Sequence, residues 1–280
     1  MSYKSMVVHI DNSRSCVERV NVAARLAIDF GAHLVGLYVT DPGEVPPSLA
    51  LQAGGDFVER WHAVRDELAR EAAQVFRERT ERTGLNGAEI RTARGDTVSA
   101  LALHGRYADL LVIGQTDPGA EDDMAFARPD LPDETVLAAG RPVLIVPYAG
   151  AFARVGEHIL VAWDASRQAA RSVTAALPFL RKAGRVTVLV VNPAEAGSHG
   201  EIPGADIALY LARHGVKVEA TQHRVKEIDV ASWLLSRAFD LGVDMLVMGG
   251  YGHSATRERL FGGVTRSLLG QMTMPVLMEH

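Results

Sequence analysis

The residues with the clearest chemical potential are glycines that follow the apolar segment Asp244–Met248. Gly249, Gly252 and Gly262 have the spacing G-x2-G-x9-G, and Gly263 continues into a helix-like stretch. Glycine allows positive φ angles and lets a ligand approach the backbone, because it has no Cβ atom. The first turn of a helix adds free N–H groups and a favourable dipole for a phosphate. The pattern therefore predicts a nucleotide-phosphate site, with a purely structural turn as the alternative.

Backbone donors dominate the predicted helix start. Gly262, Gly263, Val264 and Thr265 supply consecutive N–H groups, and Thr265 and Arg266 add a hydroxyl and a positive charge. A serine or threonine at position 263 would donate a further charge-assisted hydrogen bond, worth about 1.5–3 kcal/mol. Because Gly263 stands there instead, we expect moderate affinity, which suits sensing better than catalysis.

Asp164 is the second candidate, because it follows the predicted strand Ile159–Trp163. A carboxylate at that strand end can accept hydrogen bonds from a ribose hydroxyl or an adenine amino group. It can equally cap the helix that starts near Arg167, where Ser166 is an alternative cap. Trp163 could lie against a base, although packing is the more common role of a strand-end tryptophan.

Catalytic and metal-binding motifs are missing from the sequence. No Cys/His set has zinc spacing, and there is no nucleophile elbow, no H-E-x-x-H helix and no G-x4-G-K-[ST] loop. His253, in the glycine loop, is the only histidine well placed for chemistry, and a solvated side chain is the simpler interpretation. We therefore expect a binding protein rather than an enzyme.

The composition is that of an ordinary globular protein with room for one or two domains: 280 residues, of which 48% are hydrophobic and 22% charged. The net charge of −5 gives no support for a nucleic-acid binder. No apolar run approaches the ~18 residues of a membrane helix, and the N-terminal residues do not resemble a signal peptide. The single cysteine, Cys16, excludes an internal disulfide, so a cytoplasmic location is expected.

The chain contains an internal repeat. Three segments recur in the same order, at offsets of 153, 135 and 133 residues: 7–14 matches 160–167, 108–114 matches 243–249, and 141–145 matches 274–278. Two copies of one domain are the simplest explanation. The join falls near Tyr148–Gly156, where proline and glycine interrupt the pattern, which predicts domains at residues 1–150 and 151–280.

Each copy alternates short apolar runs with helix-period segments. The predicted strands are 6–10, 33–39, 88–92, 110–113 and 143–146 in the first copy, and 159–163, 186–191, 216–223, 245–248 and 276–278 in the second. Apolar strands that alternate with helices predict two α/β domains, each an open, doubly wound, parallel five-stranded sheet with helices on both faces. Such sheets bind ligands beyond the carboxyl ends of their strands, where Asp11, Asp164, Asn192 and the Gly249 loop all lie.

A long amphipathic helix is predicted at Asp56–Arg82, where the second copy has only a shorter one near Gly204–His214. Its apolar stripe is formed by Trp61, Val64, Leu68, Ala72 and Val75. Core packing is the expected role of this stripe, and a partner-binding face is the alternative.

The first copy lacks the phosphate-binding features of the second. The repeat places Pro129-Asp130 opposite Gly262-Gly263, and Pro132 and Asp133 opposite Thr265 and Arg266. Proline has no N–H to donate, and aspartate repels a phosphate. The acidic run at residues 121–123 could hold a hard cation, although a solvated loop is the simpler interpretation. We therefore expect the first domain not to bind nucleotide.

With its two copies, its strand-end aspartates and its glycine spacing, the chain resembles the tandem form of the universal stress protein family. The segments that carry the resemblance are 161–166, 246–249, Gly252, Gly262 and 275–277. Many members of that family bind ATP, and others do not. The family pattern has serine or threonine after the last glycine, where this chain has Gly263. The resemblance implies contacts to adenosine from the strand-end aspartate and the residues after the second strand, and contacts to phosphate from the glycine loop and the helix start.

Together these observations predict an adenine-nucleotide site, for ATP or AMP with or without Mg²⁺, in the second domain. The expected residues are Ala162, Trp163, Asp164, Val191, Asn192, Met248, Gly249, Gly250, Gly252, His253, Gly262, Gly263, Val264 and Thr265. The resemblance also implies that the strands 143–146 and 276–278 pair within one chain, and two chains could assemble further.

Three functions compete at this point. The first is a nucleotide-binding regulator of the stress response, and the second is an interaction scaffold of the same fold that binds no nucleotide. The third, an adenylating enzyme, would require a catalytic motif that the sequence does not contain.

Overall fold

The computed structural model describes residues 2–40, 55–119, 130–193, 204–225, 228–251 and 263–280. The first domain contains β1 (Ser5–Ile10), α1 (Cys16–Phe30), β2 (His33–Thr40), α3 (Gly55–Thr83), β3 (Glu89–Arg94), α4 (Thr97–Gly105), β4 (Leu110–Gly114), α5 (Leu131–Ala139) and β5 (Val143–Val146). The second contains β6 (His158–Ala162), α6 (Arg167–Lys182), β7 (Arg185–Val191), α7 (Ala205–Arg213), β8 (Val218–His223), α8 (Val230–Asp240), β9 (Met245–Gly249), α10 (Gly263–Gln271) and β10 (Val276–Glu279). Each predicted strand overlaps an observed strand.

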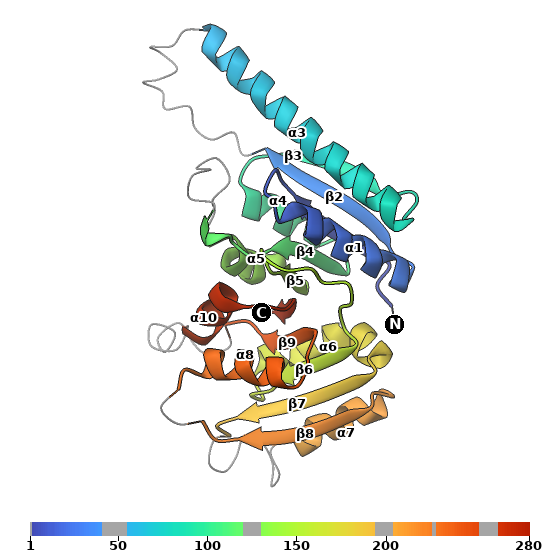
Figure 1. Cartoon of the computed structure of the whole chain (residues 1–280), viewed down its shortest axis with the longest axis vertical. Helices are drawn as coiled ribbons and strands as arrows, with labels where there is room; N and C mark the ends of the chain where they lie inside the picture. Colours follow the sequence, from blue (N-terminus) through green and yellow to red (C-terminus); the bar gives the residue numbers. More distant parts are fainter. Residues whose placement is uncertain (1, 41–54, 120–129, 194–203, 226–227, 252–262) are drawn as a thin grey trace.

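One ten-stranded sheet runs through both domains (Figure 1), in the order β3-β2-β1-β4-β5-β10-β9-β6-β7-β8. Within each half the strands are parallel. The halves meet where β5 and β10 pair antiparallel, with Leu144 opposite Leu277. The predicted fold class, two tandem doubly wound α/β domains, is confirmed.

Helices cover both faces of this sheet because its strands are apolar on both sides. One buried layer packs beneath α1, α3, α6 and α7, and the other beneath α4, α5, α8 and α10. Successive strand residues alternate between the layers: Leu160 belongs to the second and Val161 to the first. All residues of β4 and β5 are buried, so the sheet is the core of the molecule.

Aromatic rings join the two domains on the α6 side. Tyr3, Phe30 and Phe179 lie edge to face, with ring centroids 4.9–5.5 Å apart. The Tyr3 hydroxyl also donates a 2.6 Å hydrogen bond to the carbonyl of Ala175 in α6. Such pairs stabilise a contact by about 0.5–1.5 kcal/mol beyond the buried area, so this cluster fixes α6 against the first domain.

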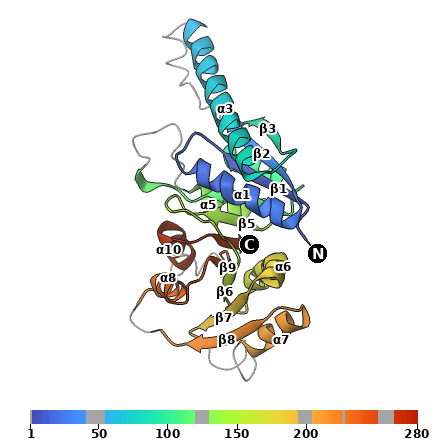
Figure 2. The same cartoon turned by 45° about the vertical axis from the view of Figure 1, so that its right-hand side comes forward.

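The expected core stripe of α3 packs only over its C-terminal part. Ala72 is buried, but Val64 is 58% exposed. The cause is visible in Figures 1 and 2: α3 continues past the edge of the sheet, so its N-terminal turns have no sheet to cover. The prediction of core packing was therefore wrong for Val64, and the Trp61 side chain lies outside what the structure describes.

Candidate functional site

The candidate site lies at the carboxyl ends of β6, β7 and β9, which the strand order β9-β6-β7 places side by side. The segments that follow these strands carry Asp164, Asn192 and Gly250. Positive φ angles at Ala165 (60°) and Asn192 (49°) show that the chain turns sharply there. The structure thus brings the predicted strand-end residues to one edge.

Asp164 is exposed and forms a local turn. Its Oδ1 accepts a 2.9 Å hydrogen bond from the backbone N–H of Ser166. The hydroxyl oxygen of Ser166 in turn accepts a 3.1 Å bond from the N–H of Ala169, so Ser166 is the N-cap of α6. The capping role considered for Asp164 therefore belongs to Ser166, and the Asp164 carboxylate faces solvent beside the helix start.

Asn192 closes the adjacent corner. Its N–H donates to the carbonyl of His223 at 2.9 Å, and its side-chain Oδ1 accepts from the N–H of Val225 at 2.7 Å. The side chain therefore ties the end of β7 to the segment after β8. A ligand would meet Asn192 mainly through its turned backbone and its amide nitrogen.

Glycine at position 249 is required by a close approach between backbones. A Cβ placed there would lie 2.5 Å from the backbone nitrogen of Ala169, at the start of α6. Gly250 is enclosed by the first domain, because a Cβ there would lie 2.7 Å from a methyl carbon of Val136 in α5. Gly249 therefore serves packing within the second domain, and Gly250 serves packing at the domain joint.

The rim of the site is apolar on one face of the sheet. Ala162, Val191 and Val264 are partly buried against the layer under α8 and α10, and Met248 belongs to that layer. Trp163 packs against the opposite layer, because strand residues alternate. Trp163 therefore lies on the opposite face of the sheet from these four residues, which agrees with a packing role.

The start of α10 is open. Gly263 is exposed, and a Cβ placed on it would meet no atom of the described residues within 4 Å. Val264 is partly buried and Thr265 is 7% exposed, so packing holds the helix within its first turn. Gly252, His253 and Gly262, together with the acidic run at 121–123, lie outside the described residues.

Helix α5 of the first domain contacts this part of the second domain. The hydroxyl of Tyr251, just after β9, donates a hydrogen bond to the Asp133 carboxylate. The guanidinium of Arg266 in α10 pairs with the carboxylate of Asp130 at 2.8 Å. From the sequence alone, only a repulsive effect on phosphate is expected of these aspartates. The antiparallel pairing of β5 with β10, which places α5 beside the second domain, was the available signal for this contact.

The joint is not symmetric in its residues. Gln115 follows β4 as Gly250 follows β9, and its Nε2 donates a 2.7 Å hydrogen bond to the carbonyl of Leu269. Gly250 instead lies against Val136, which the repeat places opposite Leu269.

The corresponding corner of the first domain is occupied by its own side chains. Arg19 is 3% exposed and lies in the position that Ser172 takes in the second copy. Its Nη2 lies 2.8 Å from the Asp11 carboxylate, and its Nε donates to the carbonyl of His9 at 2.7 Å. Its Nη1 lies so close to Gly114 that a Cβ on that glycine would be only 2.1 Å away.

The Asp11 carboxylate is fully engaged by these neighbours. Burial by itself would raise the pKa of Asp11, but Arg19, His9 and hydrogen bonds from Ser13 hold the pKa down to about 2. The counterpart of Asp164 is thus committed to an ion pair with the buried guanidinium of Arg19. Arg19 is a residue that sequence reasoning missed.

The described ranges contain neither a metal-binding cluster nor a helix suited to a membrane. No group of three or more His, Cys, Asp or Glu side chains there is arranged to hold a metal ion. None of the described helices combines the length and the hydropathy that crossing a bilayer requires.

Comparisons with known proteins agree with this architecture. The model of the universal stress protein family matches residues 2–147 and 156–280. No curated protein matches the chain. A universal stress protein structure from Archaeoglobus fulgidus covers 98% of this chain and 94% of its own at 16% identity, with a TM-score of 0.71.

Two further solved structures are similar. A putative universal stress protein from Pseudomonas aeruginosa covers 98% of this chain and 92% of its own at 17% identity, with a TM-score of 0.55. A universal stress protein from Archaeoglobus fulgidus in complex with dAMP covers 52% of this chain and 98% of its own at 18% identity, with a TM-score of 0.31. With both halves matched by the family model, the chain belongs to the universal stress protein family as a tandem of two such domains.

Proposed function

We propose that this protein is a regulator of the stress response that binds an adenine nucleotide, ATP or AMP, through its second domain. The observation that carries the proposal is the start of α10 at Gly263, which is exposed and which no atom of the described residues obstructs, near the strand end that carries Asp164. A helix start with free N–H groups attracts phosphate through its donors and its dipole.

The parts of the site divide the ligand between them. Asp164 is the acceptor for a ribose hydroxyl or the adenine amino group, with the turned backbone of Asn192 beside it. Ala162, Val191 and Met248 supply an apolar surface for the base. The phosphates take backbone N–H groups from the segments Gly249–His253 and Gly262–Thr265, of which residues 252–262 lie outside the described structure.

The donor set fits a phosphate without a strong metal requirement. Among the described residues no group of three or more His, Cys, Asp or Glu side chains is arranged to hold a metal ion. A Mg²⁺ ion that accompanied ATP would take its ligands from phosphate oxygens and water. We therefore propose binding and sensing rather than rapid hydrolysis.

The first domain is proposed to bind no nucleotide. Its strand-end carboxylate, Asp11, is held by the buried guanidinium of Arg19. Removing one partner of such a pair would leave a buried charge, at a cost of about 3–5 kcal/mol. A hydrogen bond from a ribose hydroxyl to Asp11 is too weak to offset the loss of the Arg19–Asp11 pair. We therefore expect one nucleotide per chain, bound to the second domain.

The first test is native mass spectrometry of the purified full chain, followed by thermal unfolding with ATP, AMP and adenosine. We expect a co-purifying or added adenine nucleotide at one per chain, and a rise in Tm that increases with concentration. The variant Gly263→Asp introduces the residue that the first domain carries at that position, in a place where a side chain fits. It should weaken ATP binding about tenfold or more through like-charge repulsion.

Gly270→Asp is the matched control, because Gly270 is also exposed, lies in the same helix and has open space around its Cα. Equal affinities in the two variants would contradict a phosphate site at the start of α10. The absence of any bound nucleotide and of any Tm shift with 5 mM ATP or AMP would overturn the proposed function.

An interaction scaffold of the same fold is the second candidate. The engaged Asp11 in one copy and the missing hydroxyl at Gly263 in the other favour it. It predicts that neither nucleotide changes the Tm of the chain at millimolar concentration.

A further inference from the structure

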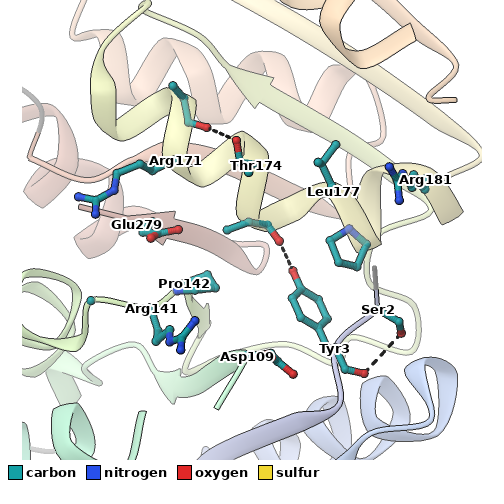
Figure 3. A pocket seen from close by; sticks show the side chains of 14 residues that line it. Ser2, Tyr3, Asp109, Arg141, Pro142, Arg171, Thr174, Leu177, Arg181 and Glu279 are labelled. Carbon is teal, nitrogen blue, oxygen red and sulfur yellow. Dashed lines mark hydrogen bonds between the residues drawn. The ribbon is translucent and has the colours of Figure 1, made fainter. Parts of the chain in front are cut away.

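A cavity lies at the joint between the domains, on the α6 side of the sheet (Figure 3). Its volume is about 620 Å³, and both domains line it. That volume is typical of small-molecule sites, which often lie at domain interfaces. None of its lining residues belongs to the proposed nucleotide site, so this inference is independent of the proposed function.

Two of the charged groups around this cavity are already used by the protein. The Asp109 carboxylate accepts hydrogen bonds from the backbone N–H groups of Lys4 and Ser5, at 2.7 and 3.0 Å. Arg181 donates from Nε to the carbonyl of His214 at 3.0 Å and lies beside that ring. Neither group needs a ligand.

The remaining three charges are Glu279, Arg141 and Arg171. Figure 3 shows the Glu279 carboxyl between the two guanidinium groups. Among the described residues, Arg171 donates one hydrogen bond, to the carbonyl of His280 at 2.9 Å, and Arg141 donates one, to the carbonyl of Arg106 at 3.2 Å. Since a guanidinium has five N–H donors, each arginine has donors to spare.

The Glu279 carboxyl has no partner within the described part of the chain, where it makes no hydrogen bond and no ion pair within 4 Å. Burial raises its pKa, while the more distant Arg171 and Arg141 counteract that rise. A half-buried acceptor of this kind is matched by a donor group that carries positive charge.

Helix α6 forms one wall of the cavity, with Thr174, Leu177 and Pro178 among its lining residues. Pro178 lies within the helix and has no N–H, so the carbonyl of Thr174 lacks its usual helical donor. Leu177 and the ring of Tyr3 line the same cavity. Acceptors, guanidinium donors and an apolar wall therefore surround one space.

We propose that this cavity binds a free amino acid. The ammonium group donates to Glu279 and to the Thr174 carbonyl, and the carboxylate accepts from Arg141 and Arg171. An apolar side chain lies against Leu177 and Tyr3. The Glu279 carboxylate would repel a phosphate or a simple carboxylic acid, and the two guanidinium groups would repel a simple amine.

The test uses the full chain and measures Tm with each of the twenty L-amino acids at 10 mM, followed by calorimetric titration of the best one. A ligand with a Kd of about 1 mM should raise Tm by about 3 °C. The decarboxylated amine and the deaminated acid of that amino acid, and inorganic phosphate, should each give less than a third of the shift. A comparable shift with any of the three, or no shift with any amino acid, overturns the proposal.

Variants locate the binding. Glu279→Gln and Arg171→Gln should each lower the affinity for the amino acid at least tenfold. If either variant fails to fold, Arg141→Gln tests the same site from the first domain. Arg181→Gln is the matched control: it lines the cavity but is bound to His214, so affinity should stay within twofold. Unchanged affinity in folded Glu279 and arginine variants would refute the assignment. ATP titration of the same variants should be unaffected, which separates this result from the nucleotide proposal.

Discussion

Replacing Gly263 by serine should convert a moderate phosphate site into a tight one. The position is suited to the change because a Cβ there meets no atom of the described residues within 4 Å and its φ is not in the left-handed region. A serine at the first residue of α10 would place a hydroxyl beside the N–H groups of the first turn. The substitution adds a donor without removing a contact.

The expected gain follows from the kind of bond added. A hydroxyl that donates to an ionised phosphate contributes about 1.5–3 kcal/mol, which corresponds to a rise in affinity of roughly 10- to 150-fold. Because the new bond is made to phosphate, the affinity for adenosine should not change. A serine also has a better helix propensity than glycine, by a few tenths of a kcal/mol, so unliganded stability should rise slightly.

Calorimetric titration of ATP, AMP and adenosine into the parent and the variant measures these effects directly. Gly270→Ser controls for helix propensity, because Gly270 lies in the same helix, is exposed and has the same open surroundings. The reasoning is refuted if the ATP affinity of the folded Gly263→Ser protein stays within twofold of the parent. It is equally refuted if the affinity for adenosine rises as much as that for ATP.

Three further predictions follow from contacts around the two domains. Asp130→Asn should release Arg266 for the phosphate and raise ATP affinity about two- to fivefold, since an exposed ion pair contributes about 0.2–1 kcal/mol. Adding Arg266→Gln should abolish this gain in affinity. A gain that persists would contradict the idea that Asp130 and ATP compete for Arg266. Burial and, to a smaller extent, Arg19 lower the pKa of His9 to about 4, so the unfolded chain binds a proton that the folded one excludes between about pH 6.5 and 4. The free energy of unfolding should therefore fall by up to about 3 kcal/mol as the pH falls through that range. Urea unfolding should show a smaller fall for His9→Ala than for the parent, and an equal fall in both would contradict the assignment to His9. Gly249→Ala should lower the free energy of unfolding by about 1–3 kcal/mol in the same assay, because its Cβ would lie 2.5 Å from the backbone nitrogen of Ala169. An unchanged urea midpoint would contradict this and would show that the two backbone segments can move apart.

The fold was predictable because the relevant signals are local and repeated. Uninterrupted apolar runs such as Val143–Val146 identify strands buried on both faces, and each repeated run supports its counterpart. The extent of α3 was predictable for the same reason, but its packing was not. Helical periodicity shows which side of α3 is apolar, whereas the edge of the sheet, which leaves Val64 exposed, is set by the assembled strands.

The strand-end positions of the candidate site were also predictable, since they follow from the topology of a parallel sheet. The partners of individual charges were not. An arginine in an amphipathic helix is ordinarily assumed to be solvated, so nothing in the pattern around Arg19 indicates its buried pairing with Asp11. The contact between Asp130 and Arg266 depends on how two distant helices meet across the joint, which residue spacing does not encode.

The pairing of β5 with β10 has a consequence for how such a molecule can change over generations. In an assembly of two identical chains every substitution occurs twice, and a residue that helps one side of the contact must be tolerated on the other. Here a single gene encodes each side separately, so Gln115 can bond Leu269 while Gly250 makes room for Val136. Covalent linkage thus removes the demand for self-complementarity, and one half is free to lose a ligand while the other keeps its geometry.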